Sequence, residues 1–211
     1  MESLSTSSSK NDWAAKPALK SEFYERDTRQ VARDLLGKIL VVRSRGQEAV
    51  VRIVETEAYG GDDPASHSSR GLTNRTRVMF GPPGRAYVYF IYGMYEMLNF
   101  VTEANGTAGA VLIRAGEPMA GLSVMARRRK LRPSFKLVDL TNGPGRLCRA
   151  LGVRLSHNGK TLDGPEFKVL DDESAPEVVI ASSPRVGISA ATDRYWRYFV
   201  EGNPFVSKAP Q

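Results

Sequence analysis

Short segments of β-forming residues, separated by tight polar turns, most constrain how this chain can fold. "ILVVRS" at 39–44 and "AVVRIVETEAY" at 49–59 are rich in β-branched residues and lie a few positions apart. Strands joined so closely pair antiparallel, because a parallel pair needs a long crossover connection. "RAYVYFIYGMYEMLNFV" has two aromatic halves around Gly93, which predicts a second hairpin. The sequence therefore predicts a mostly antiparallel sheet.

Three segments predict helices. "DTRQVARDLLGK" has an apolar stripe and Asp27 or Thr28 as its N-cap. "EPMAGLSVMARRRK" predicts a helix with Pro118 in its first turn, and "NGPGRLCRALG" predicts one capped by Asn142. "AGAVLIRAG", "PEVVIASSPRVGIS" and "YWRYFVEG" predict further strands. We therefore expect a mixed α/β (α+β) fold, with helices around one twisted sheet.

The chain of 211 residues suits a single domain. Residues 1–20 are rich in serine and contain Pro17, which predicts a disordered tail ahead of one domain at 21–211. No run of eighteen apolar residues is present, so no membrane span is expected. The single cysteine, Cys148, cannot form an internal disulfide, which fits a reducing intracellular compartment. We expect Cys148 to be a core residue.

Basic residues outnumber acidic ones, and the formal net charge is +7. From Arg127 to Arg154 there are nine Lys or Arg residues against one acid, Asp139. Such a concentration favours a polyanionic partner, although a solvated basic surface would have the same composition. The candidates for contacts with phosphates are Arg127, Arg128, Arg129 and Lys130.

Acidic residues gather in one segment, "VETEAYGGDDPASHSSR" at 54–70. It could hold a metal, place a carboxylate beside a sugar, or be a solvated loop. The possible metal ligands are Glu55, Glu57, Asp62, Asp63 and His67. Glutamates two positions apart on a strand are separated by roughly 6 to 7 Å, which is wide for joint metal ligation. A single carboxylate could instead stabilise the positive charge that develops on a sugar when a glycosidic bond breaks.

Strand alternation predicts which side chains lie together. In the strand at 49–59, alternate positions place the side chains of Val51, Ile53, Glu55, Glu57 and Tyr59 on one face. That face would change from apolar to functional as the strand ends.

The aromatic hairpin has an ordinary and a functional interpretation. Tyr87, Tyr89, Tyr92 and Tyr95 could be core residues and cross-strand pairs. Tyr87 and Tyr89 share one face, whereas Tyr92 lies beside the turn glycine, where a ring can protrude and wedge into a base stack.

Asn99 and Arg114 are polar residues in otherwise apolar strands. Unpartnered polar groups are costly to bury, so they either make internal hydrogen bonds or face a pocket. His67, in "PASHSSR", is by itself more typical of a surface loop.

Five segments follow one another in a characteristic order: "VETEAY", "ASHSSRG", "RVMFGPPGRAYVYFIYGMYEMLNFV", "GAVLIRAGEP" and "GPGRLCRAL". In order and spacing they resemble the alkyladenine DNA glycosylases, also called methylpurine or 3-methyladenine DNA glycosylases. The resemblance extends from Glu22 to Ser207. It implies a single domain with a curved sheet and a protruding hairpin, and an activity that needs no metal or other cofactor.

The resemblance also implies roles for individual residues. Glu57 corresponds to the general base, and Arg114 to the arginine that helps to position the nucleophilic water. Tyr59, His67 and Tyr89 correspond to the walls of the base pocket. The loop between Tyr59 and His67 is one residue shorter than in animal relatives, which could shift His67.

Four further positions match residues near the DNA. Tyr92 corresponds to the residue that intercalates into the duplex, and Asn99 to the residue that crowds the exocyclic amine of guanine. Met79 and Met94 resemble apolar contacts near the intercalation site.

The function implied by the resemblance is that of a monofunctional DNA glycosylase. It would flip alkylated, and also deaminated or etheno, purines out of duplex DNA and hydrolyse the N-glycosidic bond. We expect a monomer that acts on double-stranded DNA, in the cytoplasm of a bacterium or the nucleus of a eukaryote. Two alternatives remain: a catalytically silent binder of lesion DNA or RNA on the same scaffold, and a metal-dependent nuclease.

Overall fold

The computed structural model describes residues 13, 16–172 and 177–208. The strands are β1 Ile39–Ser44, β2 Gln47–Gly60, β3 Ala86–Ile91, β4 Tyr95–Val101, β5 Gly109–Ala120, β6 Phe167–Leu170, β7 Ile180–Ser183 and β8 Arg197–Val200. The α-helices are α1 Ser21–Tyr24, α2 Thr28–Asp34, α3 Leu122–Arg129 and α4 Pro144–Leu151, and the 3-10 helices are η1 His67–Arg70, η2 Arg77–Phe80, η3 Leu137–Leu140 and η4 Leu155–His157.

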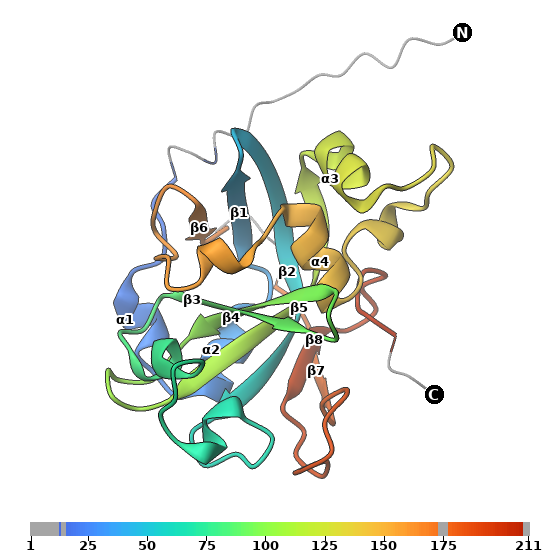
Figure 1. Ribbon diagram of the computed structural model, residues 1–211. Coiled ribbons are helices and arrows are strands. Elements are labelled where there is room, and N and C mark those ends of the chain that lie inside the picture. The colour runs from blue at the N-terminus through green and yellow to red at the C-terminus, as the bar shows by residue number, and fades with distance from the viewer. Residues whose placement is uncertain (1–12, 14–15, 173–176, 209–211) are drawn as a thin grey trace, which may run out of the picture.

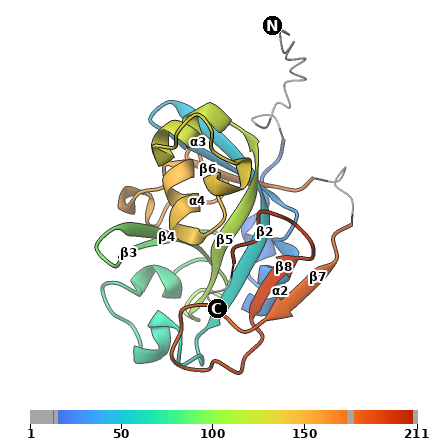
Figure 2. The ribbon, with the colours of Figure 1, turned by 90° about the vertical axis from the view of Figure 1, so that its right-hand side faces the viewer.

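The strands form one curled sheet in which neighbours run antiparallel, in the order β3-β4-β5-β2-β1-β6 (Figure 1). β2 is shared by two partners on one of its edges: its first half pairs with β1, and its second half with β8. Figure 2 shows β8 and β7 beside that second half. The expected α+β class, single sheet and hairpin are confirmed. The sequence did not predict strand β6, the edge strand next to β1.

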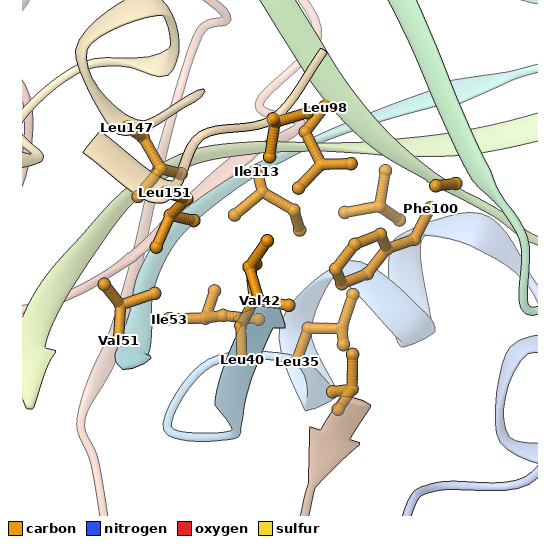
Figure 3. Packing of buried hydrophobic residues seen from close by; sticks show 14 of the residues in the cluster. Leu35, Leu40, Val42, Val51, Ile53, Leu98, Phe100, Ile113, Leu147 and Leu151 are labelled. Atoms are coloured by element: carbon orange, nitrogen blue, oxygen red, sulfur yellow. The ribbon is translucent and has the colours of Figure 1, made fainter. Parts of the chain in front are cut away.

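The main core lies where the sheet curls around α2 and α4. Figure 3 shows side chains from α4, from the C-cap of α2 and from four strands meeting there: Leu35, Leu40, Val42, Val51, Ile53, Leu98, Phe100, Ile113, Leu147 and Leu151. Cys148 is fully buried among them, as expected. One face of β2 packs against this core. The other face, in the second half of β2, is available for polar groups.

Strict alternation along β2 is wrong, because the pairing of β2 with β5 shifts register around Glu55. Val51 and Ile53 point into the main core, yet so does Ala58, an odd number of positions later. A β-bulge causes this, since one extra residue turns the following side chains to the other face. Glu57 and Tyr59 therefore face away from the core that Val51 and Ile53 fill.

Two helix starts also differ from the prediction. Pro118 lies in β5, opposite Val51 and beside a register shift, where a missing N–H is tolerated, so α3 begins at Leu122. Gly143, with φ of 147°, is the N-cap of α4, and the Asn142 side chain instead accepts a hydrogen bond from Arg146. For α2, Asp27 is the cap and accepts from two backbone N–H groups.

Most of the predicted tail at 1–20 lies outside the described residues. Of the part that is described, Trp13 is buried against Ile39 and Val41, and Ala18 forms a bridge with Leu170. Contacts with the sheet are thus present before Lys20, and the boundary between tail and domain stays a prediction. Within the described ranges, we find no helix with the length and apolar character needed to cross a bilayer.

Candidate active site

A pocket of about 290 Å³ opens between the second half of β2, the β3–β4 hairpin and the loop before η1. Of the residues that the sequence singled out, its lining includes Tyr59, His67, Met79, Tyr89, Tyr92, Asn99 and Arg114. Side chains that lie far apart in the sequence are thus brought together in one concave surface. Pro144 at the start of α4 and the loop 186–188 complete the wall.

The carboxylate of Glu57 is fully buried directly behind the pocket wall, where it contacts Tyr59, Arg114 and Val186, three residues of the lining. Its Oε1 accepts a hydrogen bond from the backbone N–H of Val186 at 2.7 Å and forms an ion pair with Arg114 Nη1 at 3.1 Å. Its Oε2 accepts from the Tyr59 hydroxyl at 2.8 Å. Each carboxylate oxygen has two acceptor sites, so Oε2 keeps one site for a further donor such as water.

Tyr59 remains a hydrogen-bond donor toward Glu57. Burial, followed by the negative charge of Glu57, raises the pKa of Tyr59 well above its usual value. The other side of its ring is covered by the Arg185 guanidinium, whose carbon lies 4.7 Å from the ring centroid. Tyr59 is therefore held between the pocket and a fixed cation.

Arg114 joins two carboxylates. Its Nε donates to Glu55 Oε1 at 2.7 Å, while Nη1 contacts Glu57. Burial alone would lower the pKa of Arg114, but the charges of Glu57 and Glu55 outweigh it and raise the pKa. Both glutamates therefore pair with arginine, and among the described residues no group of three or more acidic, histidine or cysteine side chains is arranged to hold a metal ion.

His67 and two tyrosines form the aromatic side of the pocket. The rings of His67 and Tyr89 meet edge to face at 4.5 Å, and His67 Nδ1 lies 3.0 Å from the Tyr87 hydroxyl. His67 Nε2 lies 3.3 Å from Arg75 Nη2. Arginine has no acceptor, so Nε2 accepts and the proton resides on Nδ1. His67 therefore forms part of the pocket wall.

The imidazole of His67 is neutral at physiological pH. Burial, followed by the nearby positive charge of Arg75, lowers the pKa of His67 to about 4. The aromatic wall therefore carries no charge of its own toward a bound molecule.

Asn99 both makes an internal hydrogen bond and faces the pocket, which are the two alternatives that the sequence left open. Its side chain is buried and donates to the backbone oxygen of Tyr87 at 3.1 Å, and it also lines the pocket. This hydrogen bond fixes the direction of the amide, so its position in the pocket is set by the pairing of β3 and β4.

The hairpin tip projects into solvent. Tyr92 and Gly93 have φ of 54° and 65°, which the tight turn requires, and Tyr92 is 74% exposed and Met94 58%. Met79, in contrast, is 1% exposed and packs against Tyr87. Met79 forms part of the pocket wall, which Tyr92 also lines, and its contact near the intercalation site stays a prediction.

The basic residues at the end of α3 differ in their contacts. Arg128 donates to the carbonyl oxygens of Leu151 and Ser44, and Arg129 to that of Asp139. These two guanidinium groups help to hold helices and turns together. Arg127 and Lys130 are exposed, and contact with DNA phosphates remains a prediction for all four residues.

Sequence reasoning missed the pair that supports the pocket from behind. Asp63, considered as a metal ligand, forms a fully buried ion pair with Arg185 and receives two hydrogen bonds from it. Asp62, its neighbour, is exposed. The residue after Arg185 supplies the N–H that binds Glu57. A buried Asp in an acidic loop gave no sign of an arginine partner 122 positions away.

Residues 22–204 of the chain match the family described as Methylpurine-DNA glycosylase. The chain belongs to that family. It is 49% identical to a protein of Anaeromyxobacter sp. (strain Fw109-5) over 197 residues, which cover 91% of this chain and 93% of the relative. It is 46% identical over 197 residues to a protein of Methanocella arvoryzae, with 91% and 96% covered. Each is named "Putative 3-methyladenine DNA glycosylase".

Membership of the methylpurine-DNA glycosylase family confirms the expected enzyme class, a monofunctional DNA N-glycosylase whose substrate is DNA. The resemblance noted in the sequence is confirmed over most of the chain. The roles of single residues in this glycosylase, the lesions that it removes and the way in which it reaches them are proposals.

Proposed function

We propose that this glycosylase removes damaged purines from double-stranded DNA by a single hydrolytic step, acting as a monomer on a base rotated out of the duplex. The observation that carries the proposal is the buried Glu57 carboxylate behind the wall of an aromatic pocket, in contact with the lining residues Tyr59 and Arg114. Its Oε2 accepts one hydrogen bond, which leaves a second acceptor site for water. The pocket is lined by rings that can stack on a flipped base.

Glu57 acts as the general base in this proposal. A water held by Glu57 and Arg114 gives its proton to Oε2 and attacks C1′ of the deoxyribose. The bond between C1′ and the base nitrogen breaks, and its electron pair leaves with the base. The buried carboxylate also stabilises the positive charge that develops on the sugar.

The positive charge of an alkylated purine is compatible with the walls of this pocket. Alkylation on a ring nitrogen makes the base cationic, so it leaves as a neutral molecule and needs no acid from the protein. The walls offer aromatic faces and a neutral imidazole, and the positive charge of Arg114 in the lining is balanced by Glu55 and Glu57. We include 3-methyladenine, the substrate in the names of the relatives, in this class.

The test of this function is base release from DNA methylated in vitro, in a buffer that contains EDTA. We expect free 3-methyladenine by chromatography, and strand breaks only after hot alkali. Strand cleavage before alkali that EDTA abolishes would support a metal nuclease. Retained binding without released base would support a silent binder and would contradict the proposal.

Tyr92 fills the space left by the flipped nucleotide in this proposal. Its exposure at a tight turn supports the role, since an inserted ring replaces lost base stacking. We expect Tyr92→Ala to slow base release about 10- to 100-fold, because stacking on one base is worth about 1–3 kcal/mol. Single-turnover kinetics measure this rate, and Tyr92→Phe, which keeps the ring, is the matched control. An unchanged rate in Tyr92→Ala would remove Tyr92 from this role.

A further inference from the structure

Glu55 is a fully buried carboxylate that the proposed chemistry does not use. Its Oε1 accepts hydrogen bonds from Arg114 Nε and Arg197 Nε at 2.7 Å and from the Ser207 hydroxyl at 2.8 Å. Its Oε2 accepts from the backbone N–H of Ser207 at 2.7 Å. Two arginines from different strands and a serine from the segment after β8 thus converge on one group.

The orientation of Arg114 follows from these contacts. Its Nε is held by Glu55, and its Nη2 lies 3.2 Å from the Ser207 hydroxyl. A guanidinium group is planar and rigid, so fixing two of its nitrogens determines where the third points. The third nitrogen, Nη1, is the one that lies 3.1 Å from Glu57 Oε1.

Ser207 is itself well anchored. Arg197 Nη2 donates to its carbonyl oxygen at 2.9 Å, and Phe205, two positions earlier, is buried against Val54 and Ala115. The segment 205–207 is therefore fixed to β2, β5 and β8 at once. It can hold an arginine in a defined direction because its own position is set by the sheet.

We propose that Ser207 is a positioning residue, whose hydroxyl group, together with Glu55, aims Arg114 at Glu57. This inference rests on the proposed function, in which Arg114 and Glu57 hold the attacking water. The contribution is made to the rate of base release and not to DNA affinity, because Ser207 lies behind Arg114 and is 7% exposed.

The test compares two serines that both bind Arg197. Ser183 accepts from Arg197 Nη1 at 3.0 Å, whereas Ser207 also contacts Arg114. We expect Ser207→Ala to slow single-turnover base release about tenfold, since a misaligned orienting group typically costs that much or more. Ser183→Ala should release base at the rate of the unaltered protein, and Ser207→Thr, which keeps the hydroxyl, should recover much of the rate. The Kd for DNA with an abasic-site analogue should stay the same in all variants.

Two results would overturn the positioning role. One is equal rates for Ser207→Ala and Ser183→Ala, and the other is a crystal structure of Ser207→Ala in which Arg114 Nη1 has not moved from Glu57. If the unaltered protein releases no base, the proposed function fails instead, and the crystal structure still decides where Ser207 holds Arg114. Thermal unfolding of each variant separates a loss of rate from a loss of folded protein.

Discussion

Replacement of Glu57 by glutamine is expected to slow base release by about 10²- to 10⁴-fold while lesion binding is retained. The amide oxygen can still accept from Val186 N–H and stay beside Arg114, and the amide nitrogen can donate to the Tyr59 oxygen in place of the present bond. The shape of the site is thus preserved. What is lost is the acceptor for a water proton and the negative charge beside the sugar.

Single-turnover rates and Kd values for the same lesion duplex distinguish these effects. Glu48→Gln is the matched control, because Glu48 lies at the other end of β2 and pairs with Arg43 at the surface. It removes the same charge without touching the pocket. Base release by Glu57→Gln at the rate of Glu48→Gln would exclude Glu57 as the general base.

The sequence predicts the helices and strands of this fold better than it predicts the directions in which their side chains point. Strands β1 to β5 follow from β-branched and aromatic runs, since the pattern that identifies a strand is local. The bulge at Glu55 is not local, because it arises where β2 changes its partner from β1 to β8. Strict alternation consequently gave one face for residues that the structure divides between core and pocket.

The candidate site shows the same limit. Its aromatic and acidic residues could be found from sequence, because each has an unusual place in a strand or turn. Their partners could not, since Val186, Arg185 and Ser207 reach Glu57, Tyr59 and Arg114 only through the pairing of β8 with β2. A backbone N–H, such as that of Val186, leaves no trace in the choice of side chain.

These distant partners explain why the pocket can hold so many buried charges. The inner carboxylates and guanidinium groups pair with each other, and an isolated charge in this position would cost several kcal/mol. Stability and chemistry therefore depend on the same contacts at Glu55, Glu57 and Arg114. The pair formed by Asp63 and Arg185 allows the cost of breaking a buried pair to be measured without removing a hydrogen-bond partner of Glu57.

Replacement of Asp63 by alanine is expected to lower the free energy of unfolding by about 3–5 kcal/mol. Both Asp63 and Arg185 have fully buried side chains, so the variant leaves a guanidinium group in the interior without its carboxylate. Urea unfolding followed by tryptophan fluorescence measures the change, since Trp196 lies 5.1 Å from Arg185. The control is Asp34→Ala, which breaks a surface pair with Arg26 that is 37% and 48% exposed. That variant should cost less than about 1 kcal/mol.

A second substitution separates the loss of the pair from the loss of shape. Asp63→Ala combined with Arg185→Met removes both charges and keeps an unbranched side chain beneath Tyr59, so it should recover much of the stability. The recovered protein would still lack the cation behind the Tyr59 ring, and its rate of base release then shows what that cation adds. If Asp63→Ala is no less stable than Asp34→Ala, the buried pair does not support the pocket, and the Val186 N–H is held at Glu57 by the loop alone.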